Sequence, residues 1–181
     1  MQDILASALT QLDEELTQRD LTIEIVICGA YALHLFGYSR SEHTLDVDSI
    51  TKIQSGEIQK IIEDIGQKLS LGPLWLNDQA STVSLPNGIL SRTKPIERWK
   101  SIKASLVSRE DLIKMKASAF SIRRDHTNKD WEDLILLQPT IEEIEQAIVF
   151  IKESNAPSVN SSKQGLNEFE ETLHDLRKIT K

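Results

Sequence analysis

The chain has 181 residues, of which 39% are hydrophobic and 27% are charged, as in an ordinary soluble globular domain. No apolar run approaches the ~20 residues that a membrane helix needs, and the N-terminus lacks the basic and apolar regions of a signal peptide. A cytosolic location is therefore expected. The single cysteine, Cys28, excludes an intrachain disulfide and is expected to be a buried residue at the end of an apolar strand.

The charge of the chain is unevenly distributed along the sequence. The net charge is −7, which argues against broad nonspecific binding of nucleic acid. Residues 92–124 nevertheless contain ten lysines and arginines and only three acids. This basic segment could focus an anion locally, and a solvated basic face without a partner is an equally good interpretation.

The first elements in chain order are predicted to be a helix, a strand, a turn and a second helix. Apolar residues at helical spacing predict an amphipathic helix over 2–18. Residues 23–28 form an apolar run typical of a buried strand, and Gly29-Ala30 predicts a tight turn before a short helix at 31–36.

The sequence Asp46-Val47-Asp48 follows, and it is the strongest chemical signal in the chain. On a strand, residues two apart project from the same face, with α-carbons roughly 6.6 Å apart. Two carboxylates placed in this way can converge on one hard cation. The pair therefore predicts a metal clamp, although an Asp-x-Asp at a strand end is also found as a simple polar edge.

The middle of the chain alternates between clear and weak patterns. An apolar stripe predicts a helix over 58–69 that ends near Gly72-Pro73. Short strands are possible at 74–76 and 82–85, with a turn after the second, and residues 102–107 alternate as a strand does.

Helices dominate the remainder of the chain. One begins after Ser108, with Leu112, Met115, Ala119 and Ile122 expected to face inward. Another covers 129–137 and ends at Pro139, and Thr140 to Glu143 form a capping box that opens a third. Residues 154–165 are small and polar and predict a linker. Beyond it lies a short apolar seam, expected to dock on the body of the protein, of Leu166, Phe169, Leu173 and Leu176.

Two regions of the sequence resemble the nucleotidyltransferase superfamily, and more narrowly the AbiEii-like toxin-type nucleotidyltransferases of bacterial abortive-infection systems. The first region consists of the runs 26–33, 37–40 and 44–48, which end in the aspartate pair. The second consists of the runs 112–119 and 123–134, which contain a lysine on a helix and a later Asp…Asp-Leu element. Two elements in the right order make the resemblance more specific than either alone.

The resemblance implies an α/β fold, with a small mixed β-sheet of nucleotidyltransferase type flanked by helices and followed by a helical C-terminal part. The nucleotidyltransferase-like domain would cover residues 1–138, and a helical extension would cover 139–181. Within that extension the linker at 154–165 would separate two helices.

The resemblance also implies a Mg²⁺ site with an NTP bound beside it. Asp46 and Asp48 would hold the ion against the triphosphate. Gly29 and Ala30, with little or no side chain, would let backbone amides and the start of the next helix approach the phosphates. Thr44 belongs to the same run and is assigned to the nucleotide.

The remaining assignments are mostly cationic. Lys116, Arg40 and Arg123 would neutralise triphosphate charge. Asp130, together with Asp133 one helical turn away, would complete the catalytic site or orient Lys116 or Arg123. Each has a structural alternative, since Lys116 beside an apolar stripe can extend to solvent and acids near a helix start are favoured by the helix dipole.

The sequence departs from the family pattern at two places. Cys28-Gly29-Ala30 stands where many members have Gly-Gly or Gly-Ser, and the predicted strand at 102–107 has no third carboxylate. Either one Mg²⁺ suffices, with Asp130 or Asp133 assisting, or the protein keeps the scaffold without efficient catalysis.

Three functions are consistent with these patterns. The first is Mg²⁺-dependent transfer of a nucleotidyl group from an NTP to an acceptor hydroxyl on tRNA or a protein, in a toxin–antitoxin or phage-defence setting. The second is a catalytically silent module that binds a protein partner such as an antitoxin. The third is a metal-dependent nuclease that uses the same carboxylates.

Overall fold

The computed structural model of the protein describes residues 3–38, 44–53, 56–123, 129–159 and 163–180. The chain divides into two compact units. The first unit comprises Met1–Val83 and Gly88–Ser108, and the second comprises Ser84–Asn87 and Arg109–Lys181.

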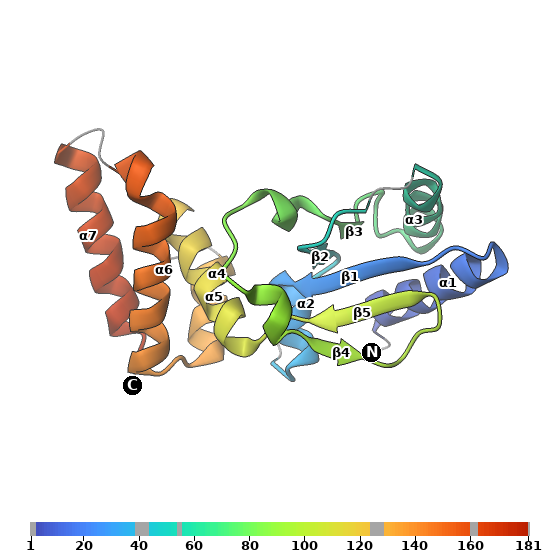
Figure 1. Ribbon diagram of the computed structural model, residues 1–181, viewed down its shortest axis with the longest axis horizontal. Helices are drawn as coiled ribbons and strands as arrows, with labels where there is room; N and C mark the ends of the chain where they lie inside the picture. Colours follow the sequence, from blue (N-terminus) through green and yellow to red (C-terminus); the bar gives the residue numbers. More distant parts are fainter. Residues whose placement is uncertain (1–2, 39–43, 54–55, 124–128, 160–162, 181) are drawn as a thin grey trace. The chain divides into compact units, whose positions relative to one another are not determined.

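The first unit contains a five-stranded mixed sheet with the strand order β3-β2-β1-β5-β4 (Figure 1). Strand β1 is parallel to β5 and antiparallel to β2, β2 is parallel to β3, and β4 is antiparallel to β5. The end of β1 therefore lies beside the start of β2. The strands are β1 (Ile23–Cys28), β2 (Val47–Ser49), β3 (Leu76–Asn77), β4 (Lys94–Ile96) and β5 (Ile102–Leu106).

The first unit also contains three helices, α1 (Ile4–Gln18), α2 (Gly29–Leu35) and α3 (Gly56–Leu69). Helices α1 and α2 pack on the sheet, and α3 packs on α1. Figure 1 shows α1 and α2 behind the strands. Helix α1 begins where the Asp3 carboxylate accepts hydrogen bonds from the N–H groups of Leu5 and Ala6, a standard N-cap. Its apolar stripe is buried, as is the isoleucine stripe of α3.

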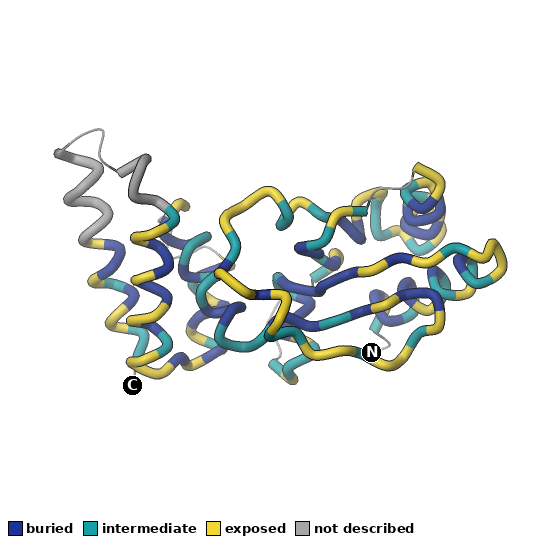
Figure 2. The backbone as a smooth tube through the Cα atoms, in the orientation of Figure 1, coloured by how far each residue is buried: buried dark blue, intermediate teal, exposed yellow. Residues whose placement is uncertain are grey.

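Burial along the strands shows which of them are central. Strand β1 is buried at every position except Glu24, as expected for a strand between two others. Strand β5 instead alternates, with Ile102, Ala104 and Leu106 buried and Lys103 exposed. In Figure 2 the dark blue segments of β1 and β5 run next to each other and mark the core of this unit.

The mixed α/β fold predicted from the sequence is confirmed, but two short elements were not predicted correctly. Residues 82–85 do not form a strand, because a 3-10 helix covers Gln79–Thr82 and the following residues pair with no strand. Strand β4 was not predicted at all. Its three residues include Pro95, which is tolerated there because β4 is an edge strand.

The second unit is helical and contains α4 (Arg109–Arg123), α5 (Lys129–Leu137), α6 (Ile141–Val159) and α7 (Lys163–Lys178). Helix α4 packs on both α5 and α6, and α7 packs on α6. The predicted capping box is confirmed, since the Thr140 N–H donates to Glu143 Oε2 at 2.9 Å and the Glu143 N–H donates to Thr140 Oγ1 at 3.2 Å.

Three features of this unit differ from the sequence predictions. Helix α6 continues to Val159 and α7 begins at Lys163, so most of the predicted linker at 154–165 is helical. The two compact units separate at residues 108 and 109, whereas the predicted domain boundary is at 138. On α4, Leu112 is buried as predicted, but Met115 and Ala119 are half-buried and Ile122 is 68% exposed. The rest of the buried apolar face is formed by Ile113, Ala117 and Phe120.

The seam of the last helix docks as predicted where its side chains are described, because Leu173 and Leu176 are fully buried. No helix in the described ranges is both long enough and apolar enough to span a lipid bilayer.

Candidate functional site

Gly29 lies at the junction of β1 and α2, where the strand ends at Cys28 and the helix begins with no intervening loop. Its φ is +66°, in the left-handed region that favours glycine. A Cβ atom built on Gly29 would lie 2.1 Å from Asp48 Oδ2, which is closer than real atoms approach. The turn predicted at Gly29-Ala30 is thus a single glycine with a carboxylate seated against its backbone.

Asp48 occupies the middle of β2, which lies between β1 and β3 in the sheet. In the sheet it stands opposite Cys28 on β1 and opposite Asn77 on β3. Asn77 Nδ2 donates to Asp48 Oδ1 at 3.1 Å, and the Cys28 thiol donates to the Asp48 carbonyl oxygen at 3.5 Å. Asp48 therefore lies between the ends of two flanking strands.

Asp46 lies in a different environment. The strand that was expected to hold both acids covers only Val47–Ser49, so Asp46 precedes it and is exposed. The Thr44 hydroxyl donates to Asp46 Oδ1 at 2.5 Å. The two carboxylates are two residues apart in the sequence, but only Asp48 lies in the strand, so one strand does not hold both as predicted.

The donor set indicates what kind of ion could bind here. Asp46 and Asp48 offer oxygen ligands, and Mg²⁺ is usually bound by one or two carboxylates together with substrate phosphates. Across the described ranges, no group of three His, Cys, Asp or Glu side chains could hold a metal. The pair fits an ion whose remaining ligands are waters or phosphate oxygens.

Two other predicted residues of this region have different outcomes. Ala30 is half-buried in the first turn of α2, directly after Gly29. Arg40 lies outside the residues that the structure describes.

The predicted residues of the second unit form a cluster of charges between α4 and α5. Lys116 Nζ lies 3.0 Å from Asp130 Oδ1 and 2.7 Å from Asp133 Oδ2. Arg123 Nη1 lies 2.5 Å from Asp130 Oδ2. Asp133 is fully buried and the Lys116 side chain is only 13% exposed, whereas the Arg123 side chain is 61% exposed.

The ammonium of Lys116 is held in its charged form by this cluster. Burial by itself lowers the pKa of Lys116, but the nearby carboxylates of Asp133 and Asp130 outweigh burial, and the pKa is raised above its ordinary value. Lys116 therefore joins α4 to α5 as a buried cation, and Arg123 is the cation of this cluster that faces solvent.

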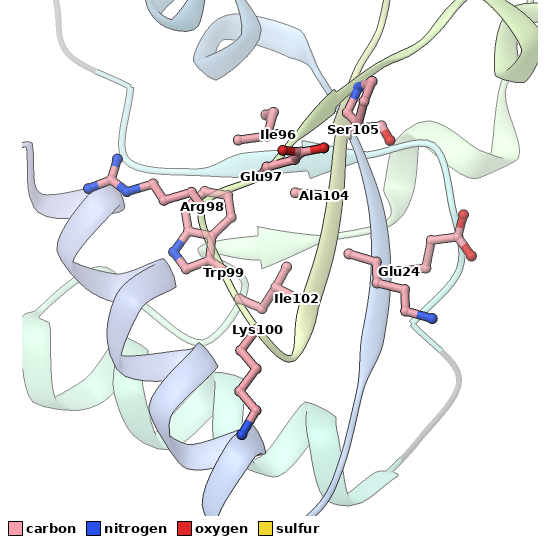
Figure 3. Close-up of a pocket in the computed structure, with 11 residues that line it drawn as sticks. Glu24, Ile96, Glu97, Arg98, Trp99, Lys100, Ile102, Ala104 and Ser105 are labelled. Atoms are coloured by element: carbon pink, nitrogen blue, oxygen red, sulfur yellow. The ribbon is translucent and has the colours of Figure 1, made fainter.

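A hollow of about 590 Å³ lies in the first unit along β5 and the segment before it (Figure 3). Three of its lining residues, Arg98, Lys100 and Lys103, belong to the basic segment found in the sequence, and Glu24 and Glu97 offset part of their charge. The Arg98 guanidinium lies over the Trp99 ring, 5.5 Å from its centroid. Neither Asp46 nor Asp48 lines this hollow.

Asn77 is the residue at this site that sequence reasoning missed. It is 9% exposed and directly contacts Asp48. The run Leu74-Trp75-Leu76 suggested a strand, but only the pairing of β2 with β3 places the next residue opposite Asp48. The signal that could have found it is a buried amide at the end of an apolar run, which requires hydrogen-bond partners.

Comparison with known proteins adds a family to this geometry. The family described as a nucleotidyltransferase of unknown function (DUF6036) matches residues 7–174, which is most of the chain and includes both the aspartate pair and the Lys116 cluster. No curated protein and no solved structure matches the chain. The chain therefore belongs to this nucleotidyltransferase family of unknown function.

Proposed function

We propose that the protein is a Mg²⁺-dependent nucleotidyltransferase that moves a nucleotidyl group from an NTP to an acceptor hydroxyl. The main support is the Asp48 carboxylate, which is seated against the backbone of Gly29 at the end of β1. The residue after Gly29 is Ala30, whose side chain is small. A carboxylate held at the end of a strand suits a site where a metal ion must be positioned for phosphates.

The reaction needs alignment and charge neutralisation more than a special nucleophile. The acceptor oxygen forms a bond to the α-phosphorus of the NTP, the bond from that phosphorus to the bridging oxygen breaks, and pyrophosphate leaves. The acceptor hydroxyl loses its proton to a base or to water. A bound Mg²⁺ would supply charge neutralisation for the phosphate oxygens.

The residues of the first unit have distinct roles in this proposal. Asp48 is the fixed ligand, and Asp46 is the exposed ligand, which Thr44 orients through its hydroxyl. Gly29 makes room for the Asp48 carboxylate, and the small side chain of Ala30 is proposed to let phosphate approach beside it. Arg40 is proposed to neutralise phosphate charge near the pair.

The residues of the second unit are proposed to act through Arg123. Asp130 contacts both Lys116 and Arg123, so it can orient the exposed guanidinium while the buried Lys116 balances its charge. Within this unit, the exposed Arg123 is a better candidate than the buried Lys116 for contact with an anion, and Lys116, Asp130 and Asp133 support it.

The acceptor is proposed to be a tRNA or a protein, and the setting a toxin–antitoxin or phage-defence system of the AbiEii-like kind. An anionic acceptor is supported by the basic residues Arg98, Lys100 and Lys103 along the hollow in the first unit. The resemblance of the aspartate region to the toxin-type enzymes supports the setting.

The proposal is tested by incubating the protein and Mg²⁺ with each of four NTPs labelled at the α-phosphate, together with total cellular RNA and protein. Asp46→Asn and Asp48→Asn should each lower label transfer by about 100-fold or more, since each removes a negatively charged ligand that would hold Mg²⁺ against the phosphates. Asp64→Asn, which changes an exposed carboxylate on α3, should retain wild-type transfer.

Equal transfer by the wild type and both aspartate variants would refute the proposal. RNA cleavage without any NTP would instead indicate the nuclease.

One observation favours a second function, a silent module that binds a partner protein. The described residues provide no third acid beside the aspartate pair, which a two-metal mechanism would use. Calorimetry distinguishes the two functions, because a silent module would give no heat with Mg²⁺ and any NTP and would still bind an antitoxin-like partner tightly.

A further inference from the structure

We infer that Asn77 is a positioning residue that fixes the orientation of the Asp48 carboxylate. The inference rests on the proposed function, in which Asp48 is a metal ligand. It adds a residue on β3 that neither the family match nor the sequence motifs assign.

The hydrogen bonds of Asn77 determine which way its amide points. The Gln79 N–H donates to Asn77 Oδ1 at 3.1 Å, so the oxygen must face Gln79. Nδ2 then faces the Leu74 carbonyl oxygen at 3.4 Å and Asp48 Oδ1 at 3.1 Å, both of which are acceptors. A flipped amide would place oxygen against oxygen at both positions, so the donor side faces Asp48.

Asp48 is held from two sides as a result. Asn77 binds its Oδ1 from β3, and Gly29 at the end of β1 lies against its Oδ2. Asp46 is exposed and has the Thr44 hydroxyl beside it, in a segment that precedes the strand. The site thus has one ligand held by the sheet and one held only by a neighbouring hydroxyl in an exposed segment.

Preorganisation of this kind affects how tightly a metal binds. A ligand side chain whose orientation is already fixed by a neighbouring hydrogen bond loses little rotational freedom when the metal binds. Removal of such a hydrogen-bond partner typically costs about 10–100-fold in metal affinity. Asn77 is 9% exposed, so water cannot easily take over its contact with Asp48.

The experiment measures binding of Mn²⁺ alone, by the loss of its free EPR signal, to the full chain well below its melting temperature. Asn77→Ala is expected to weaken Mn²⁺ binding about tenfold. The EPR lines of the bound ion should also broaden, because the Asp48 oxygen then takes several orientations.

Asn77→Ser provides a second variant in case Asn77→Ala folds poorly. A serine hydroxyl can still accept from the Gln79 N–H, as hydroxyls two residues before an amide often do. It is too short to donate to Asp48, so the same loss of affinity and the same broadening are expected.

Asp78→Ala is the matched control. Asp78 follows Asn77 in the chain and accepts from the Ile53 N–H at 2.8 Å, so its loss loosens the same segment while the donor to Asp48 stays in place. If Asp78→Ala weakens Mn²⁺ binding as much as the Asn77 variants, Asn77 is only structural and the inference is overturned.

Asp48→Asn separates this inference from the proposed function. If the wild type binds Mn²⁺, Asp48→Asn abolishes binding and both Asn77 variants bind as the wild type does, only the role of Asn77 fails. If the wild type and Asp48→Asn bind equally or not at all, the proposed metal site fails and the role of Asn77 fails with it.

Discussion

At the scale of single residues, the absence of a side chain at Gly29 is what allows Asp48 to lie where it does. An alanine there would meet both a left-handed backbone and the Asp48 carboxylate. We expect Gly29→Ala to lower the free energy of unfolding by about 2–5 kcal/mol, because about 1–2 kcal/mol of backbone strain adds to the cost of the clash. Urea unfolding followed by circular dichroism measures the loss.

Gly37 offers a control with the same backbone problem and no clash. Its φ is +86°, and a Cβ atom there would meet nothing within 4 Å. Gly37→Ala should cost only the strain, about 1–2 kcal/mol. Equal losses for the two variants would mean that Asp48 moves away without cost and is not held against Gly29.

Single residues also show what the sequence could and could not predict about the site. Gly29 and Asp48 were predictable because their signals, a glycine after an apolar run and an acid pair two residues apart, lie within a few residues of each position in the sequence. Asn77 was not, since its contact with Asp48 depends on the register between β2 and β3, which no local pattern determines. Ile122 was wrongly predicted to face inward because apolar residues occur on two sides of α4. The side that contains Phe120 is the one buried in the fold.

At the scale of elements, the start of β5 is fixed by one side chain of α1. The Asp13 carboxylate accepts from the N–H groups of Lys100, Ser101 and Ile102 at 2.6 to 3.2 Å. Asp13→Ala leaves these donors without that partner and should lower the free energy of unfolding by about 2–4 kcal/mol. A hydrogen bond to a charged group contributes about 1.5–3 kcal/mol net, and the three bonds here share one carboxylate and are not additive.

Glu14→Ala is the comparison for this prediction, because Glu14 is the exposed neighbour of Asp13 on the same helix. It should change the free energy of unfolding by less than about 0.5 kcal/mol, as exposed substitutions usually do. Thermal unfolding of both variants checks the difference, and a mild effect of Asp13→Ala would show that β5 does not depend on α1 for its start.

The contact between α4 and α5 depends on the buried ammonium of Lys116. Lys116→Met leaves Asp130 and Asp133 without their shared cation and should lower the free energy of unfolding by about 3–5 kcal/mol, the usual cost of removing one partner of a buried pair. Lys114→Met, on the same helix and paired with the half-exposed Glu110, should cost under about 1 kcal/mol.

The raised pKa of Lys116 gives this effect a defined pH dependence. A lysine whose pKa in the folded state lies above its ordinary value of 10.5 stabilises the fold fully below that value and loses the effect as pH rises through the folded pKa. The stability difference between wild type and Lys116→Met should therefore be constant near neutral pH and shrink only above 10.5. Denaturant titrations across this range test it, and a difference that grows with pH would contradict the ion cluster.

The long helices were predictable at this scale, and the short strands were not. Helices α1, α3 and α6 each repeat their apolar residues over several turns, so the period is clear in the sequence. Strands β3 and β4 have two and three residues, too few to show alternation. Helix α6 extends through the small polar residues after 153 because weak propensity does not end a helix that is already packed.

At the scale of the whole molecule, the chain divides where the sheet ends and the helices begin. The sequence suggested a boundary after residue 138, because Pro139 and the capping box at Thr140 mark a clear local break. The structure groups α4 and α5 with the later helices, since α4 packs on both α5 and α6. A local stop signal ends a helix, but only packing defines a unit.

This division predicts which part of the chain folds alone. A fragment of residues 109–181 contains all four helices of the second unit, including the faces that cover the buried Ile144, Ile148 and Ile151 of α6, and should show helical circular dichroism with cooperative thermal unfolding. A fragment of residues 139–181 leaves those isoleucines without α4. It should be largely unfolded or unfold without cooperativity, because two helices bury too little apolar surface. A cooperative shorter fragment beside an unfolded longer one would move the boundary back to 138.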